Sequence, residues 1–178
     1  DEGSPGRDWN VATGMVIEGK AGFQIMGDWA KGEFTAAGKT PGVDYYCSPT
    51  PSNNGYLYNV DSFIFYKTSD PDKQEGQKLL AKLMMGKNFQ KVFNLYKGSI
   101  PARLDVSMDE FDKCAKTSNA DIKTAGASGG LVPSFAHGMA QGNTMKAALQ
   151  DIITEHFNSD MSSVDAANAL ADSVLANM

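Results

Sequence analysis

The chain has 178 residues, of which 42% are hydrophobic and 21% charged, with a formal net charge of −5. This composition is too apolar for a disordered protein, and no apolar run reaches the roughly 18 residues that a membrane-spanning helix needs. The acidic balance and the lack of a basic cluster argue against a nucleic-acid-binding surface. The opening residues are polar and acidic, so we expect no signal peptide within this chain.

The first 55 residues predict two helices, a strand between them and a loop. Apolar residues at helical spacing predict a helix over 9–17, and the run AGFQIM at 21–26 is typical of a short buried strand. Asp28 is a good N-cap for a helix that fades by residue 38. The Pro-rich stretch 38–55 predicts a loop.

The middle of the chain predicts a strand pair or one long strand, followed by helices. Residues 56–66, YLYNVDSFIFY, are aromatic and β-branched, which favours strand structure. Asp70 and the proline after it mark the start of a helix whose apolar face contains three leucines and Met84. A second helix is expected over about 88–97, ending at a glycine, and a short amphipathic stretch over 105–117.

The last third predicts helices and no further long strand. Residues 118–130 contain a short helix and the Gly-rich string AGASGG, and a long helix is expected over about 139–157. Ser162 and Ser163 are caps for a final helix. Many helices with few strands indicate an α/β or α+β domain. Because such a domain normally has four to six strands, about the average for a sheet, the chain is expected to be a piece of a larger protein.

One enzyme motif is present, in an unsuitable context. The string from Gly126 to Gly130 matches the G-x-S-x-G pattern of serine hydrolases, with Ser128 as nucleophile and Asp151 and His156 as candidate partners. That motif requires a hydrophobic strand before it and a helix directly after it, and neither is predicted here. The two partners, five positions apart, fall on different faces of one predicted helix. A flexible loop is the stronger interpretation.

Metal and cofactor sites are not indicated. The chain has two cysteines and two histidines, without C-x-x-C spacing, and no phosphate-binding or dinucleotide-binding motif. We therefore expect neither a metal nor a cofactor. Cys47 and Cys114 are either two buried thiols or one disulfide, which would require an oxidising compartment, and composition leaves both open.

Five single residues admit a structural and a functional interpretation. The two tryptophans each begin a predicted helix, where an indole packs in a core or offers a stacking platform to the apolar face of a sugar ring. A carboxylate in an aromatic strand is a turn residue or an acceptor for sugar hydroxyls. A lysine at a helix end complements the helix dipole, and a histidine before a helix is a cap or a hydroxyl partner. These residues are Trp9, Trp29, Asp61, Lys97 and His137.

Four strings that contain most of these residues resemble one family. They are GFQIMGDWAKGEF (22–34), YNVDSFIF (58–65), NFQKVFNLYKGSIPAR (88–103) and LVPSFAHGMA (131–140). In this order they closely resemble the periplasmic glucose-binding proteins of bacterial ABC importers, within the carbohydrate solute-binding family that includes maltose-binding protein. The resemblance covers nearly the whole chain and points to the C-terminal half of such a protein.

The resemblance implies a fold and a division of the chain. Family members have two α/β lobes joined by a hinge, and sugar binds in the cleft between them. This chain would be the helix-rich C-terminal part of that fold. Residues 1–61 would belong to the C-terminal lobe, residues 62–108 to the N-terminal lobe, and residues 109–178 to the C-terminal lobe again. The missing lobe would explain the shortage of predicted strands.

The resemblance also implies residue roles. Six side chains would contact sugar, by ring stacking from Trp9 and Trp29 and by hydrogen bonding from Asp61, Lys97, His137 and, as a weaker candidate, Asn59. Cys47 and Cys114 would form a disulfide, as in close relatives. Part of the site would belong to the missing N-terminal lobe, so these residues alone do not identify the aldose.

The function implied is binding without catalysis. Such a protein captures a monosaccharide, most simply glucose or a related aldose, in the periplasm and delivers it to the membrane permease of an ABC importer. Two alternatives remain at this point. One is the serine hydrolase based on Ser128, and the other is a non-catalytic interaction domain in which both tryptophans are core residues.

Overall fold

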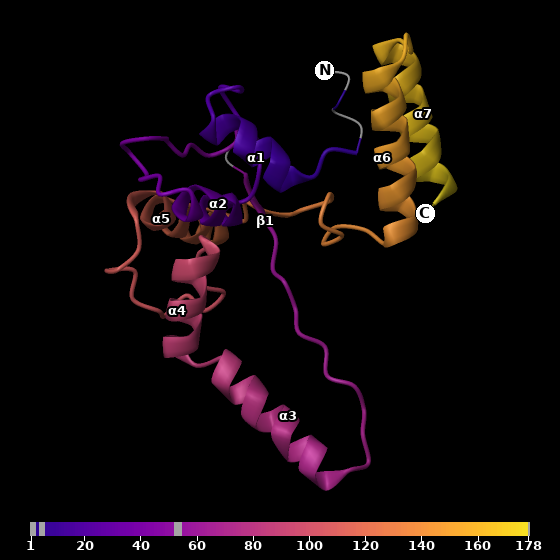
Figure 1. The fold of residues 1–178 in the computed structure, drawn as a ribbon. Coiled ribbons are helices and arrows are strands. Elements are labelled where there is room, and N and C mark those ends of the chain that lie inside the picture. Colours follow the sequence, from indigo (N-terminus) through magenta and orange to yellow (C-terminus); the bar gives the residue numbers. More distant parts are fainter. Residues whose placement is uncertain (1–2, 4–5, 52–54, 178) are drawn as a thin grey trace. The chain divides into compact units, whose positions relative to one another are not determined.

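The computed structural model describes residues 3, 6–51 and 55–177, and it is mostly helical (Figure 1). In chain order the elements are α1 (Trp9–Ile17), the 3-10 turn η1 (Asp28–Ala30), α2 (Lys31–Ala36), β1 (Tyr56–Tyr58), α3 (Pro71–Met84), α4 (Lys87–Lys97), α5 (Lys113–Ser128), β2 (Leu131–Pro133), α6 (Asn143–Asn158) and α7 (Ser163–Ala176). The strands β1 and β2 pair in a two-stranded sheet. The expected helix-rich composition with few strands is confirmed for the described residues. Residues 52–54 of the predicted loop lie outside them.

The chain divides into two compact units. The larger unit contains residues 7–56 and 60–131, and therefore α1 to α5. The smaller unit contains residues 57–59 and 132–177, and in it α6 and α7 pack against each other as a helical hairpin (Figure 1). Met145 of α6 and Ala166 of α7 are buried in that hairpin.

The helix ends follow the local signals in the sequence. The Asp70 carboxylate accepts the backbone N–H groups of Asp72 at 3.0 Å and Lys73 at 3.3 Å, which caps α3 as predicted. Helix α4 ends at Gly98, whose φ of +87° lies in the left-handed region. The Ser162 hydroxyl caps α7. Helix α6 begins four residues later than predicted, after an extended N-cap glycine.

Two predicted strands are wrong or much shorter than expected. Residues 21–27 form neither strand nor helix, and the side chains of Phe23 and Ile25 are 96% and 83% exposed. Of the predicted strand at 56–66, only Tyr56–Tyr58 pairs as β1. A strand forms only where a neighbour supplies hydrogen bonds, and no described residue pairs in a sheet with residues 21–27 or 59–66.

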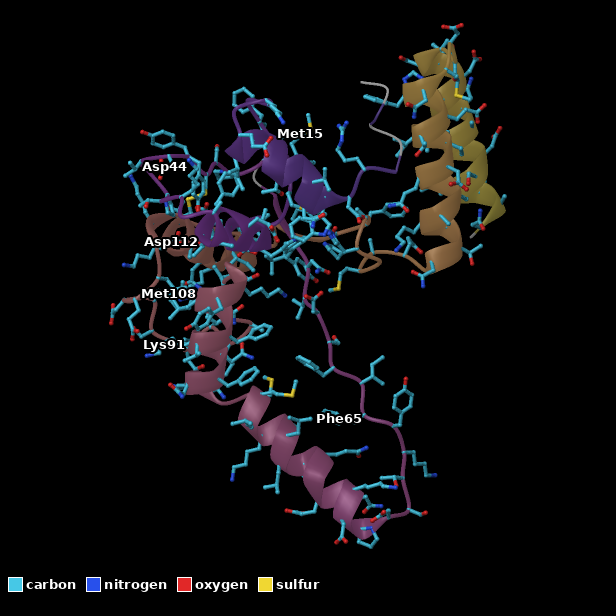
Figure 2. All side chains as sticks on the ribbon, in the orientation of Figure 1. Met15, Asp44, Phe65, Lys91, Met108 and Asp112 are labelled. Atoms are coloured by element: carbon cyan, nitrogen blue, oxygen red, sulfur yellow. A yellow bond between two sulfur atoms is a disulfide. The ribbon has the colours of Figure 1, made fainter. Side chains whose placement is uncertain are left out.

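The apolar face predicted for α3 is largely open within this chain. Leu79, Leu80 and Leu83 are exposed, and only Met84 is buried. The segment that leads from β1 to α3 runs extended in Figure 1, and it also carries exposed apolar side chains, including Phe65, which is labelled in Figure 2. Hydrophobic periodicity identified the helix correctly, but the side chains that would cover it are not among the described residues.

Helix α5 replaces a predicted break. The sequence predicts an amphipathic stretch, a short helix and a Gly-rich loop over 105–130, whereas one continuous helix spans Lys113–Ser128. Asp112 caps it by accepting the N–H of Ala115 at 2.9 Å. Gly126 is tolerated in the last turn, at a modest cost in helix propensity, and Gly129 ends the helix with φ of +72°.

The core of the larger unit is small and is supplemented by a disulfide. Its buried side chains include Phe34 of α2, Ala115 of α5 and Phe111, which precedes α5. The ring of Phe34 stacks on Tyr45 with centroids 4.2 Å apart. Cys47 and Cys114 form the disulfide that the resemblance implied, with Cα atoms 5.7 Å apart. It ties the long loop after α2 to the first turn of α5. Within the described part of the chain, no helix combines the length and apolarity needed to cross a membrane.

Candidate functional site

Trp29 is held in the tight turn that precedes α2. It is the middle residue of η1, and its side chain is half-buried. The indole folds back over Gly27, so that a Cβ at Gly27 would overlap the ring of Trp29. The glycine in the Gly-Asp-Trp string therefore leaves the space that the indole occupies.

Lys97 and Asp61 come together although 36 positions separate them in sequence. Lys97 is the last residue of α4, and its Nζ donates to the Oδ2 of Asp61 at 2.7 Å. The same Nζ lies 5.7 Å from the centroid of the Phe93 ring, within cation–π range. The Asp61 side chain is 68% exposed and that of Lys97 is 32% exposed. Two of the predicted hydroxyl-binding groups thus form one charged, solvent-accessible pair.

The elements that carry Trp29 and Lys97 are in direct backbone contact. A Cβ added to Gly98 would lie 2.6 Å from the backbone nitrogen of Gly32, and one added to Gly32 would lie 2.9 Å from the carbonyl oxygen of Lys97. Neither position has room for a side chain without movement of the other backbone. The two glycines therefore let the first turn of α2 approach the end of α4, three residues from Trp29 and directly beside Lys97.

Trp9 lies on a neighbouring helix. It is the first residue of α1, which packs against α2, and its side chain is 40% exposed. Its backbone carbonyl accepts hydrogen bonds from the Thr13 hydroxyl and from the Gln24 side-chain amide, each at 3.0 Å. Because the indole is partly exposed, Trp9 is not a fully buried core residue within this chain.

His137 and Asn59 belong to the smaller unit, unlike the other four predicted sugar-binding residues. The Nδ1 of His137 lies 2.6 Å from the hydroxyl oxygen of Ser134, which is 3% exposed. Ser134 in turn donates its backbone N–H to the carbonyl of Tyr58 in β1. Asn59 follows β1 directly and is half-buried. The imidazole is thus oriented by a buried serine beside the two-stranded sheet.

Ser128 does not have the surroundings of a nucleophile. It lies at the C-terminal end of α5, where its hydroxyl is 3.2 Å from the carbonyl oxygens of both Thr124 and Ala125. A nucleophile elbow instead places its serine on a sharp turn from a strand into a helix. The Nδ1 of His156 lies 2.9 Å from the carbonyl oxygen of Met161. The local structure therefore gives no support to a hydrolase built on Ser128.

Sequence reasoning missed a partly buried ion pair beside the candidate site. Lys31 of α2, whose side chain is 7% exposed, donates to Asp112 Oδ2 at 2.7 Å, and Figure 2 marks Asp112 at the start of α5. Burial alone would raise the pKa of Asp112, but the hydrogen bonds from Lys31 and from backbone N–H groups lower it overall. Burial, with the nearby charge of Asp112, raises the pKa of Tyr45 to about 12. The helix-capping position of Asp112 was readable from sequence, but its partner 81 residues away was not.

From the Lys31–Asp112 ion pair we predict a decrease in the free energy of unfolding in acid. The pKa of folded Asp112 is below its ordinary value of 3.8, so its ionisation stabilises the fold above about pH 4, and this contribution disappears as the pH falls through the lowered pKa. Lys31→Met is expected to reduce that part of the decline, because the backbone hydrogen bonds to Asp112 remain. Urea unfolding at about pH 6 and about pH 2.5 measures it. Lys91→Met, which removes a more exposed pair with Glu110, should retain the decline, and identical pH dependence in Lys31→Met and the parent would refute the prediction.

The chain is similar in sequence to several bacterial and archaeal binding proteins. No protein-family model matches the chain. A probable sugar-binding periplasmic protein of Brucella suis is 47% identical over 98% of this chain, and one of Rhizobium meliloti is 44% identical over 98%. An uncharacterized ABC transporter extracellular-binding protein of Pyrococcus horikoshii is 35% identical over 84% of the chain. The aligned regions are 41%, 42% and 33% of these relatives, so the chain spans about two fifths or less of their length.

Proposed function

We propose that this chain, a homologue of the probable sugar-binding periplasmic proteins over 98% of its length, is part of a periplasmic protein that binds a monosaccharide for an ABC importer. The observation that carries the proposal is the accessible Asp61–Lys97 pair, placed by the Gly32–Gly98 contact on the same body as Trp29. An aromatic face combined with a few charged hydrogen-bonding groups is the chemistry that recognises a sugar ring and its hydroxyls.

The proposed ligand is D-glucose or a closely related aldose. Trp29, with Trp9 from the neighbouring helix, would cover the apolar C–H face of the ring. The Asp61 carboxylate would accept hydrogen bonds from ring hydroxyls, and the Lys97 ammonium would donate to hydroxyl oxygens. In the smaller unit, His137 and, more weakly, Asn59 would supply further hydroxyl contacts. The proposed contacts are ring stacking and hydrogen bonds to hydroxyls, so binding rather than catalysis is proposed.

We also propose that residues 1–61 and 109–178 belong to one lobe of the longer protein and residues 62–108 to the other. Support comes from the apolar side chains that this chain leaves exposed on Phe63, Ile64 and the leucines of α3. Several large apolar side chains exposed on neighbouring segments of the sequence suggest a surface that another part of the protein covers. The relatives are long enough to supply a covering lobe. Sugar that contacts both lobes would favour their closed arrangement, because only that arrangement makes all the contacts. The importer would then receive the closed, loaded form.

A fluorescence titration tests the proposal. We expect a saturable change in tryptophan emission when D-glucose is added to the longer protein, and a weaker change with this chain alone. D-galactose and maltose serve as the selectivity controls. Because this chain contains only two tryptophans, Trp9→Phe and Trp29→Phe each leave a single reporter in it. Trp29→Phe is expected to remove the larger part of the change, since Trp29 lies in the turn before α2, whose first turn contacts the end of α4 at Lys97. No saturable change with any of the sugars, in either the chain or the longer protein, would defeat the proposal.

A further inference from the structure

Asp28 makes a long-range contact that its sequence position does not suggest. The sequence predicts that Asp28 is an N-cap, but η1 begins at Asp28 itself and Gly27 is the N-cap. The Asp28 carboxylate instead accepts the backbone N–H of Ile100 at 2.8 Å, 72 residues along the chain. Asp28 precedes Trp29 directly, and Ile100 lies three residues after Lys97. One hydrogen bond therefore connects the turn that carries the indole with the loop that follows the lysine.

This hydrogen bond spans the same contact that the two glycines permit. The end of α4 is pressed against the first turn of α2 so closely that a Cβ on Gly98 would lie 3.1 Å from the Cβ of Lys31. Gly98 and Ser99 are buried at this junction. Close packing supplies contact but little direction, whereas a hydrogen bond to a carboxylate also constrains orientation. The junction therefore has a packed part, made by the glycines, and a directional part, made by Asp28.

The Asp28 carboxyl lies in an environment that disfavours its charged form. Burial raises the pKa of Asp28, against the opposing effects of the Ile100 hydrogen bond and of the nearby Lys31 and Lys97 charges. Water does little to stabilise a carboxylate that is buried in this way. The hydrogen bond from the Ile100 N–H and the charges of the two lysines offset part of the effect of burial.

We infer that Asp28 is a positioning residue that holds Trp29 and Lys97 in a fixed mutual geometry through its hydrogen bond to Ile100. The inference rests on the proposed function, because the geometry it preserves is that of the proposed sugar site. Asp28 itself is not assigned a contact with sugar. Its effect on binding is transmitted through the loop after α4 and through the turn that carries the indole.

The test compares Asp28→Ala, which removes the acceptor, with Asp28→Asn, which keeps an acceptor oxygen of the same size. Asp70→Ala is the matched control, because Asp70 also accepts backbone N–H groups at a helix start but lies far along the chain from Trp29 and Lys97. Two quantities are measured in the longer protein. One is the hydrogen exchange rate of the Ile100 amide without sugar, and the other is the Kd for D-glucose.

We expect Asp28→Ala to speed exchange at Ile100 by about tenfold or more and to raise the Kd by about tenfold, as for loss of one partly buried hydrogen bond. Asp28→Asn should restore most of both quantities, and Asp70→Ala should change neither. A Kd unchanged in Asp28→Ala, with faster Ile100 exchange, overturns the inference while the proposed function stands. Equal losses of affinity in Asp28→Asn and Asp28→Ala also overturn it, since the hydrogen bond would not be the cause. If the parent itself binds none of the sugars tested, the proposed function fails and the inference fails with it.

Discussion

Asp61→Ala is expected to weaken D-glucose binding by the longer protein about 100-fold. The substitution removes a carboxylate that would accept sugar hydroxyls, and it also removes the anion 2.7 Å from the Lys97 ammonium. Loss of a charged hydrogen-bonding partner in a binding site typically costs about 2–3 kcal/mol, which corresponds to this change in Kd. Isothermal titration calorimetry of parent and variant measures it directly.

A matched control separates this effect from a general loss of charge. Asp105 is also exposed and also pairs with basic side chains in the larger unit, Arg103 and Lys87. Asp105→Ala should therefore bind D-glucose like the parent. If Asp61→Ala bound sugar as tightly as Asp105→Ala, Asp61 would have no role in the site, and the pair with Lys97 would be an ordinary surface ion pair of little energetic importance.

Removing the disulfide is expected to lower the free energy of unfolding by about 4 kcal/mol. Cys47 and Cys114 are 67 positions apart, and cross-linking a loop of that length lowers the conformational entropy of the unfolded chain. At 25 °C this raises the free energy of the unfolded state by about 4 kcal/mol. The small core of the larger unit makes the contribution important to its stability. The measurement is urea unfolding of the Cys47→Ser/Cys114→Ser double variant against the oxidised parent.

Reductant provides the control for the disulfide prediction. Adding dithiothreitol should bring the parent close to the double variant and should leave the double variant unchanged. If the oxidised parent and the double variant unfolded at the same urea concentration with the same slope, the bridge would make no contribution in solution. An intact disulfide also agrees with the proposed periplasmic location, because that compartment is oxidising.

The helices were the part of the fold most readily predicted. Helix α3 begins at an aspartate followed by proline, and α4 ends at a glycine that adopts a left-handed conformation. These signals operate through hydrogen bonds and dihedral preferences within a few residues, so they are legible without tertiary information. The Gly-rich string around Gly126 misled for the opposite reason, because a capped and packed helix tolerated residues of low helix propensity.

The strands could not be predicted in the same way. The runs around Phe23 and Phe63 have strand composition, but the described residues offer them no pairing partner and both side chains are exposed. Strand structure depends on a neighbour that can be far away in sequence or outside this chain altogether. Composition therefore identified segments suited to a sheet without deciding whether they form one here.

For the candidate site, residue types and local helix ends could be read from the chain, but the contacts between them could not. Trp29, Asp61 and Lys97 were identifiable as candidates, and the resemblance named their roles. The pairing of Lys97 with Asp61, the Ile100 contact of Asp28 and the Lys31–Asp112 ion pair span 36, 72 and 81 positions. Such contacts depend on how helices pack, and here two glycines permit that packing by removing the side chains that would separate α2 from α4. Local hydrogen bonding thus determined the helices, whereas close backbone approach between distant segments determined which charged groups meet.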